Sequence, residues 1–427
     1  MTTKKLFNRN FTLMVIGQII SLFGNSILRF ALSLYILDVT GSATVFGTIL
    51  ALSMVPTILL SPVGGVLADR VNRRNIMVCL DFCTSALCLI LFTQLGNSHI
   101  TVMIGGFMMI LAVIQSFYQP SVQSSIPVLV DGEHLLAANG VAVQVNALAN
   151  LIGPVLGGML YGFFGLKVIV VVSICAFFAS AVMEIFIHIP FKRQQRQGSA
   201  VGMVVSDLGQ AVRFLGRENP VLLKILLVVA AINLFFSTMI MVGFPYIVKI
   251  QLGLSSQLYG FVEGAMAVGS IGAGLASGII AHKLNVKKSW IFIVLGGIAI
   301  LPVVAAEILS LPALGIYGVL LASSVACMLF VSMFTIYAQA FMQSQTPNAL
   351  MGKVSAFVAA ICTCAYPLGQ ALYGVLFDKF SSSLFWIVLF AVVVEMLLGI
   401  VTRFYLAKLP DGKTEEAVEN EPQEVLS

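Results

Sequence analysis

The chain has 427 residues, of which 59% are hydrophobic and only 10% are charged. Soluble globular domains carry about 25% charged residues, so this composition excludes a soluble protein and predicts an integral membrane protein. The formal net charge of +5 comes from basic residues that are scattered over short loops without clustered aromatic residues. That distribution excludes a nucleic-acid-binding surface and indicates orientation in a membrane.

Apolar runs long enough to cross a bilayer recur along the chain, and about 20 apolar residues make one transmembrane helix. The expected spans are residues 11–37, 43–68, 75–95, 100–122, 135–164, 167–189, 221–248, 256–281, 289–309, 312–340, 352–377 and 382–406. The pattern predicts an all-α polytopic membrane protein with twelve transmembrane helices. The seven cysteines all lie in apolar runs, where we expect reduced, buried thiols.

Lysine and arginine are distributed unequally between the two sets of loops. If the N-terminus is inside, the outer segments hold only Lys167, Lys249 and Lys379, and nearly all other basic residues are inside. Because basic residues are retained on the cytoplasmic side, we expect a multi-pass protein of the cytoplasmic membrane with both termini in the cytoplasm.

Charged residues cluster between the second and third spans, in the sequence GGVLADRVNRR at 64–74. A central Asp or Arg costs about 2.5–3.5 kcal/mol in a membrane helix, so this segment must be a loop at the membrane surface. Gly64 and Gly65 should let a neighbouring helix approach closely. Asn72 is expected to supply the positive φ of a sharp turn.

This loop resembles the signature loop between helices 2 and 3 of the major facilitator superfamily. The matching residues are Gly65, Asp69, Arg70, Asn72, Arg73 and Arg74, with Asn72 in place of the usual glycine. The resemblance implies a role in gating. We expect Asp69 to accept hydrogen bonds from the backbone at the start of helix 11, near Gly352, where the helix dipole is positive.

The fifth span contains a second motif, Gly153-Pro154 followed by Gly157-Gly158. It resembles the helix-5 motif of antiporters in the same superfamily that export their substrate. Proline should kink the helix, and the glycines should permit close packing against the partner half. A kink that serves only structure is the alternative interpretation.

A long polar stretch, residues 191–219, separates the first six spans from the last six. Its apolar residues recur at helical spacing and predict an amphipathic linker helix at the cytoplasmic membrane surface: Met203, Val204, Leu208, Val212 and Leu215. The expected domains are an N-terminal bundle at 1–190, this linker at 191–219, a C-terminal bundle at 220–408 and an acidic, disordered tail at 409–427.

The two halves repeat each other. GVLADRVNRR at 65–74 is echoed by GIIAHKLNVKK at 278–288, and LYG at 160–162 by LYG at 372–374. Two six-helix pseudo-symmetric bundles are the layout of the major facilitator fold. The sequences LYILDVTGSA and SFYQPSVQSSIPVLV resemble the macrolide-efflux-like and siderophore-exporter-like branch of that superfamily.

Three charged residues within the spans are candidates for proton coupling: Arg29, Asp81 and Glu263. Ionisable groups inside a membrane are functional candidates by default, because their burial is costly. Asp81 has the alternative of belonging structurally to the charged loop at 64–74. Arg29 is the only deep cation and needs a carboxylate, a polar cluster or an anionic substrate as its partner.

Other acidic residues in the spans are assigned no coupling role. Glu184 and Glu307 lie within two turns of a helix end, so we expect their carboxylates to reach the membrane surface. Glu395 is deep but lies on helix 12, which the resemblance implies to be peripheral.

Uncharged polar residues in the spans are candidates for the substrate pathway, with hydrogen bonding between helices as the alternative for each. They are Gln18, Asn25, Gln115, Tyr118, Gln144, Asn146, Asn233 and Gln339. No nucleotide-binding loop, metal-ligand spacing or nucleophilic triad stands out. We therefore expect no enzyme activity, no cofactor and no metal.

These observations predict a secondary active exporter of amphiphilic, macrolide-like small molecules by proton antiport and alternating access. The abundant Met and Phe (18 and 30) suit an apolar, adaptable cavity. Its expected partners are the substrate, protons and lipid, and we expect a monomer that binds no nucleic acid. Export of a siderophore or lipid-like metabolite, uniport or import, and a non-transporting membrane scaffold or sensor remain as alternatives.

Overall fold

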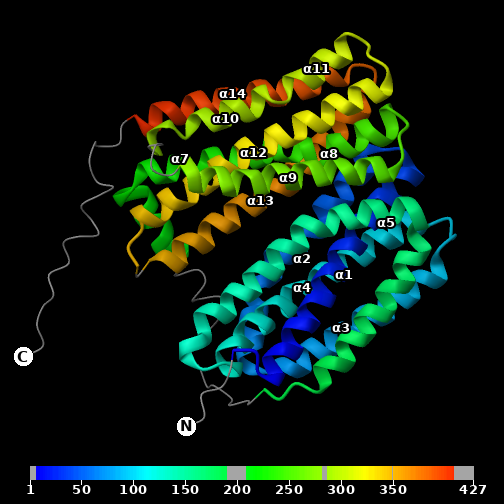
Figure 1. The fold of residues 1–427 in the computed structure, drawn as a ribbon, viewed down its shortest axis with the longest axis vertical. Coiled ribbons are helices and arrows are strands. Elements are labelled where there is room, and N and C mark those ends of the chain that lie inside the picture. The colour runs from blue at the N-terminus through cyan, green and yellow to red at the C-terminus, as the bar shows by residue number, and fades with distance from the viewer. Residues whose placement is uncertain (1–5, 190–207, 281–285, 349, 408–427) are drawn as a thin grey trace, which may run out of the picture.

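A computed structural model describes residues 6–189, 208–280, 286–348 and 350–407, apart from the side chains of Pro62, Val66, Asp69, Arg70, Ile280 and Val286. The described chain is helical, and its helices form two bundles that lie side by side (Figure 1). Eleven helical runs in the described chain are long and apolar enough to cross a membrane. One of them contains two spans, so the expected twelve transmembrane helices are confirmed.

The N-terminal bundle contains the first six spans. Its helices are α1 (Arg9–Thr40), α2 (Ala43–Arg70), α3 (Arg73–Gln94), α4 (Ile100–Leu129) and α5 (Leu135–Ile185), with a short 3-10 turn at Gly132–His134. Helix α5 is interrupted at Gly165, where φ is 70° and ψ is 174°. Only glycine adopts such torsions readily, so this residue turns the fifth span into the sixth without a loop.

The C-terminal bundle begins with a helical run in which α-helical and π-helical turns alternate. This run contains α7 (Pro220–Ile232), η3 (Asn233–Ser237), α8 (Thr238–Tyr246) and η4 (Ile247–Gln251). The remaining spans are α9 (Ser256–Ile280), α10 with α11 (Trp290–Ile298 and Leu301–Ile308), α12 (Ala313–Gln345), α13 (Met351–Lys379) and α14 (Leu384–Leu406). Short turns at η2 (Phe214–Glu218) and η5 (Val286–Lys288) precede α7 and α10.

Helix ends are set by local side-chain chemistry. Asn8 and Ser42 cap α1 and α2 by accepting hydrogen bonds from backbone N–H groups in the first turn, at 3.0 and 3.2 Å. Asn72 does the same for α3, accepting from the Arg74 N–H at 3.1 Å. The expectation of a positive φ at Asn72 is wrong: its φ is −62°, because the side chain acts as an N-cap and needs no left-handed backbone.

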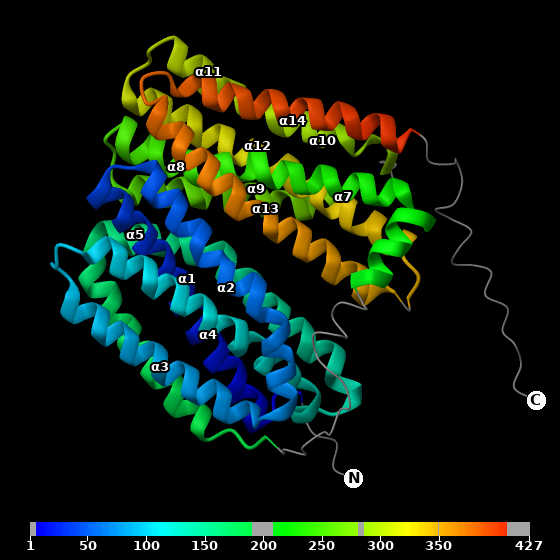
Figure 2. The same cartoon turned by 180° about the vertical axis from the view of Figure 1, so that it is seen from behind.

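Contacts between the bundles concentrate at one end of the molecule, which we call the closed end. It comprises the connection between α1 and α2, the Gly165 turn, and the ends of α8 and α13. Figures 1 and 2 show the bundles diverging from the closed end towards the end at which α1 begins and α14 ends, which we call the diverging end. Helix α2 crosses α13, and α5 crosses α9, at the closed end.

Packing within the N-terminal bundle separates the two glycines at 64 and 65. A Cβ at Gly64 would lie 1.9 Å from the Ser116 carbonyl oxygen of α4, so only glycine fits at this crossing of α2 and α4. A Cβ at Gly65 would meet nothing within 4 Å. The expectation of close helix approach is therefore confirmed for Gly64 and wrong for Gly65.

The described part of the linker packs against the C-terminal bundle. Ala211, Phe214 and Leu215 are buried in an apolar cluster with residues of α7, α12 and α13. Val212, which was expected on the same apolar face, is exposed instead. Met203 and Val204 lie outside the described residues.

Candidate functional site

A cavity of about 740 Å³ lies between the two bundles. This volume lies within the range of sites that bind drug-sized molecules, about 300–1,000 Å³. The N-terminal bundle contributes Phe30, Ser33, Leu34, Phe46, Leu50 and Pro154 to its wall. The C-terminal bundle contributes the larger part, from α7 to α14, including four methionines: Met241, Met266, Met328 and Met342. The expected apolar, methionine-rich cavity is therefore present.

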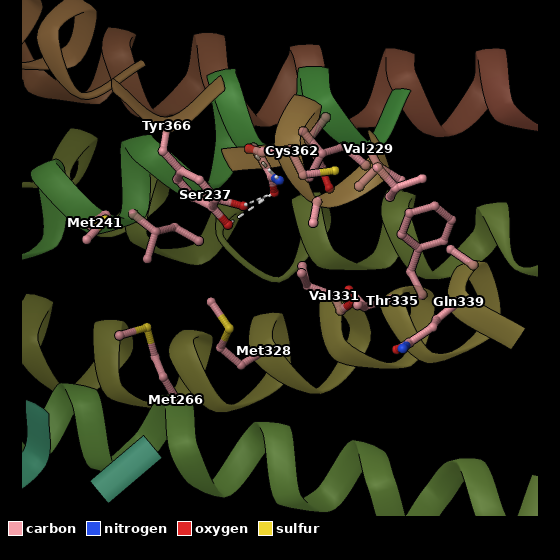
Figure 3. Close-up of a pocket in the computed structure, with 18 of the residues that line it drawn as sticks. Val229, Ser237, Met241, Met266, Met328, Val331, Thr335, Gln339, Cys362 and Tyr366 are labelled. Carbon is pink, nitrogen blue, oxygen red and sulfur yellow. Dashed lines mark hydrogen bonds between the residues drawn. The ribbon is translucent and has the colours of Figure 1, made fainter. Parts of the chain in front are cut away.

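One wall of the cavity carries a small polar group centred on Asn233. The Asn233 side chain accepts hydrogen bonds from the hydroxyls of Tyr366 and Ser237, at 3.3 and 3.4 Å, and donates to the Cys362 carbonyl oxygen at 3.4 Å. Asn233 and Ser237 begin and end a π-helical turn, a local distortion that is frequent at functional sites. Figure 3 shows this group facing Met328 and Val331 of α12 across the cavity.

Two carboxylic acids are the only charged side chains among the described residues that line the cavity: Glu263 and Glu395. Glu263 accepts a hydrogen bond of 2.6 Å from the Tyr259 hydroxyl, and the Tyr259 ring stacks on Phe30 of the other bundle at 5.7 Å. Glu395 is 1% exposed and its Oε2 has no hydrogen-bond partner. The expected peripheral position is therefore wrong for Glu395, because α14 turns this residue towards the bundle interior.

The closed end is sealed by glycines that bring backbones of the two bundles together. A Cβ at Gly158 of α5 would lie 2.8 Å from the Gly260 Cα of α9. A Cβ at Gly47 of α2 would lie 2.3 Å from the Gln370 carbonyl oxygen of α13. Larger side chains at these positions would hold the bundles apart.

A carboxylate also joins the two bundles at the closed end. Asp378, in the last turn of α13, accepts hydrogen bonds from the Ser42 hydroxyl at 2.6 Å and from the backbone N–H groups of Ala43 and Thr44 at 2.8 and 2.9 Å. These donors form the N-terminus of α2, where the helix dipole favours a negative charge. Asp378 and the start of α2 are 336 residues apart in sequence and belong to different bundles; we call this contact the Asp378 latch.

A second polar contact joins the bundles at the closed end. Lys249 forms an ion pair of 2.5 Å with Asp38, which also accepts a 2.7 Å hydrogen bond from the Tyr161 hydroxyl. Lys249 further donates to the Ser256 hydroxyl, and Gln257 donates to a backbone carbonyl of α5. Sequence reasoning assigned no function to these residues, because charges at helix ends are ordinary at a membrane surface.

The N-terminal bundle contains a separate buried polar cluster, which we call the acid cluster. It consists of Gln18 and Ser21 on α1, Asp81 on α3, Tyr118 on α4, and Ser180 and Glu184 on α5. All six side chains are at most 2% exposed. The Ser21 hydroxyl donates to Asp81 at 2.5 Å, and the Tyr118 hydroxyl donates to Glu184 at 2.8 Å. The expectation that Glu184 reaches the membrane surface is wrong, because its helix face points into the bundle.

The other predicted polar residues are dispersed. Asn233 and Gln339 line the cavity. The remaining candidates, which do not line it, are Gln18, Asn25, Gln115, Tyr118, Gln144 and Asn146. Asn146 donates to a backbone carbonyl of its own helix at 2.9 Å, and Gln144 is exposed. Arg29 donates to the Ser53 hydroxyl of α2 at 3.2 Å, so its described partner is a hydroxyl rather than a carboxylate.

The helix-5 motif contacts both its own bundle and its partner. A Cβ at Gly153 would collide with the Ser26 side chain of α1, and a Cβ at Gly157 would lie only 3.1 Å from Phe30 of α1, so these glycines serve packing inside the N-terminal bundle. Only Gly158 of the motif faces the other bundle closely. Pro154 lines the cavity, and the break in this helical run lies at Gly165 rather than at the proline.

The signature loop is described in part. Arg73 donates to the Ala68 carbonyl oxygen at 3.1 Å, and Arg74 donates to the carbonyl oxygen of Ile185, so both arginines tie the loop to its own bundle. The side chains of Asp69 and Arg70 lie outside the described residues, so the expected contact near Gly352 stays a prediction.

Two bundles of six membrane helices that enclose a central cavity define a membrane transport protein of the major facilitator type. The Major Facilitator Superfamily family model matches residues 14–306 and 226–427, so the chain belongs to this superfamily.

Its relatives include exporters. The chain is 23% identical to macrolide efflux protein A of Streptococcus pyogenes over 364 residues, which covers 85% of this chain and 88% of the relative. It is 24% identical to enterobactin exporter EntS of Citrobacter koseri over 373 residues, covering 82% of each chain. A crystal structure of a bacterial homologue of the iron transporter ferroportin in an inward-facing state superimposes with a TM-score of 0.70, at 15% identity, over 94% of this chain and 99% of the other.

Proposed function

We propose that this protein is a secondary active exporter that moves amphiphilic small molecules across the cytoplasmic membrane in exchange for protons. The observation that carries the proposal is the cavity of about 740 Å³ between the bundles, whose wall is mostly apolar and whose only charged side chains among the described residues are Glu263 and Glu395. Such a wall suits a solute with a large apolar body and a basic group. The similarity to proteins named for macrolide efflux and enterobactin export supports the direction.

Orientation follows from the distribution of lysine and arginine. With both termini in the cytoplasm, the closed end faces outward and the diverging end faces inward. The substrate then enters the cavity from the cytoplasm or the inner leaflet. Release requires the closed end to separate while the diverging end closes, which is alternating access by rocking of the two bundles.

The proposed switch between the two states uses two acids, each in the last turn of its helix. Asp378 lies in the last turn of α13 and holds the N-terminus of α2 at the closed end. Asp69 lies in the last turn of α2, and the N-terminus of α13 begins at Met351. We infer that Asp69 holds that N-terminus when the diverging end is closed. Each helix would then offer its first turn to the acid of the other, in alternate states.

Proton coupling needs a carboxylic acid that is exposed in one state and enclosed in the other. Asp81 and Glu263 are the candidates from the sequence, and Arg29 lies in the same bundle as Asp81. Glu263 lines the cavity, so a cationic substrate and a proton would compete for it. Asp81 does not line the cavity, so a proton there would act through the conformation of the bundle.

The test is a susceptibility panel in an efflux-deficient bacterial host, with and without the gene, followed by transport into inside-out vesicles. The panel contains lipophilic amines, neutral analogues matched in size, and catecholate siderophores. Protection against the amines, abolished by a protonophore, supports the proposal. Uptake of these compounds that ignores the proton gradient would instead indicate a uniporter, and no effect on any compound would refute export.

Siderophore export is the second candidate, because the chain is similar to an enterobactin exporter at 24% identity, close to its 23% identity to a macrolide efflux protein. The charge of the cavity favours the amine. An anionic solute would meet Glu263 and Glu395 without a lysine, arginine or histidine among the described lining residues. If the gene increases siderophore export and gives no protection against the amines in the same panel, siderophore export becomes the first candidate.

A further inference from the structure

The acid cluster of the N-terminal bundle lies outside the substrate cavity, and none of its six residues lines that cavity. Two carboxyl groups are enclosed there, on α3 and α5. A buried ionised carboxylate without a counter-charge is strongly unfavourable, so two together require protons or a bound cation. The described residues of the cluster supply no cation.

Unused oxygen atoms point to a ligand. Glu184 Oε2 has no hydrogen-bond partner, and neither Gln18 Oε1 nor Gln18 Nε2 has one, although both side chains are 0% exposed. Gln18 lies one turn before Ser21 on α1, and its neighbour Gly17 packs against Glu184: a Cβ there would be 3.2 Å from Glu184 Oε1. Buried polar atoms normally form hydrogen bonds, so these atoms are available to bind a ligand.

The donor set determines the kind of ligand. Carboxylate, amide, hydroxyl and backbone oxygens surround the site. The Ser180 hydroxyl lies 3.0 Å from the Ser21 hydroxyl and 3.2 Å from the Gly17 carbonyl oxygen, and it can donate its single proton to either. Oxygen ligands select hard cations and disfavour soft transition metals. The other titratable group at the pair is the Tyr118 hydroxyl from α4, which donates to Glu184. The nearby Arg74 guanidinium donates to the backbone carbonyl oxygen of Ile185, the residue after Glu184.

We propose that Asp81 and Glu184, with Gln18, Ser21 and Tyr118, bind the monovalent cation that drives transport, a proton or a sodium ion. The proposal deepens the proposed function and rests on it. Ion and substrate then bind in different places, and their exchange is coupled through α1. This helix carries Ser21 of the ion site and also Phe30 of the cavity wall, two and a half turns further on.

The path from the diverging end of the molecule to the ion site is short. Glu184 is one residue from the end of α5, and the following backbone is tied to α1 by a 3.1 Å hydrogen bond from the His188 N–H to Asn10. Release of this segment would expose Glu184 at the diverging end. The glutamate therefore serves as the entry ligand, and Asp81 lies deeper in the bundle.

The experiment measures ion binding without substrate. The thermal unfolding midpoint of the purified full-length protein is followed in sodium chloride against choline chloride at equal ionic strength, and on both sides of neutral pH. A sodium ion predicts a midpoint that rises with sodium. A proton predicts a midpoint that depends on pH alone. Either response should disappear in Asp81→Asn and Glu184→Gln and persist in Glu307→Gln, a carboxyl variant in the other bundle.

A response that is the same in the wild type and in both acid-cluster variants overturns the proposal. If Asp81→Asn and Glu184→Gln fail to fold, Ser21→Ala and Tyr118→Phe each remove one hydroxyl and should weaken the apparent ion affinity about tenfold. Unchanged affinity in both also overturns it. Substrate protection in cells is scored separately, so export with no ion response refutes the ion site alone, and an ion response without export refutes the proposed function alone.

Discussion

Replacing Asp378 with alanine removes the acceptor of the Asp378 latch, and we expect the closed end to open more often. Three hydrogen bonds are lost, two of them from the backbone of α2. Hydrogen bonds to a charged group contribute about 1.5–3 kcal/mol each, but this carboxylate is half-exposed, and water replaces much of the interaction. A net loss of about 2 kcal/mol shifts the equilibrium between the two states about 30-fold.

The assay is a distance distribution across the closed end, from spin labels at Ser98 and Leu314 in a background without reactive cysteines. Both positions are exposed and lie in different bundles. Asp378→Ala should transfer population to the longer distance, and Asp378→Asn should give a smaller transfer, because one acceptor oxygen remains. Lys379→Gln, the adjacent charge, is the matched control. Identical distributions for Asp378→Ala and the wild type would refute the latch, as would an equal change in the control.

Three further outcomes follow from named contacts. Gly64→Ala should lower the free energy of unfolding by about 1–3 kcal/mol, because its Cβ would overlap a backbone carbonyl of α4, whereas Gly65→Ala should leave the thermal midpoint unchanged. Gly158→Val should abolish vesicle transport by keeping the closed end apart, and Gly140→Val, on the same helix with free space around it, should transport normally. Glu263→Gln should weaken the affinity for a lipophilic amine about tenfold and leave the affinity for its neutral analogue unchanged. An equal loss of affinity for both compounds would show that the Glu263 carboxylate does not discriminate between charged and neutral substrates.

The fold could be predicted from the sequence because a bilayer imposes length and hydrophobicity on every span. The positions of the spans followed from hydropathy. The fifth and sixth spans form one helical run in the structure, because the turn at Gly165 has no polar loop. The packing role of Gly64 followed from its place in an apolar helix. Gly65 is adjacent but points elsewhere, and a sequence does not reveal which of two neighbouring glycines faces another helix.

The site was predicted less well, because the position of a residue along a helix does not show which way its side chain faces. Glu184 is near a helix end but faces inward, and Glu395 lies on a helix that was expected to be peripheral. A signal for Glu184 was present: Ser173, Ser180 and Glu184 recur on one helix face and are all buried. Asp378 was missed because an acid in a last helical turn has an ordinary explanation in solvent. Its function depends on a helix N-terminus more than 300 residues away.

The connections at the closed end are so short that they leave no segment able to move as a lid. Residues 41–42 join α1 to α2, Gly165 alone joins the fifth and sixth spans, and residues 95–99 form the longest connection on that side. Opening must therefore tilt whole bundles against the surrounding lipid. We therefore expect each turnover to deform the bilayer around the helices, and we expect the transport rate to change with the thickness of the membrane.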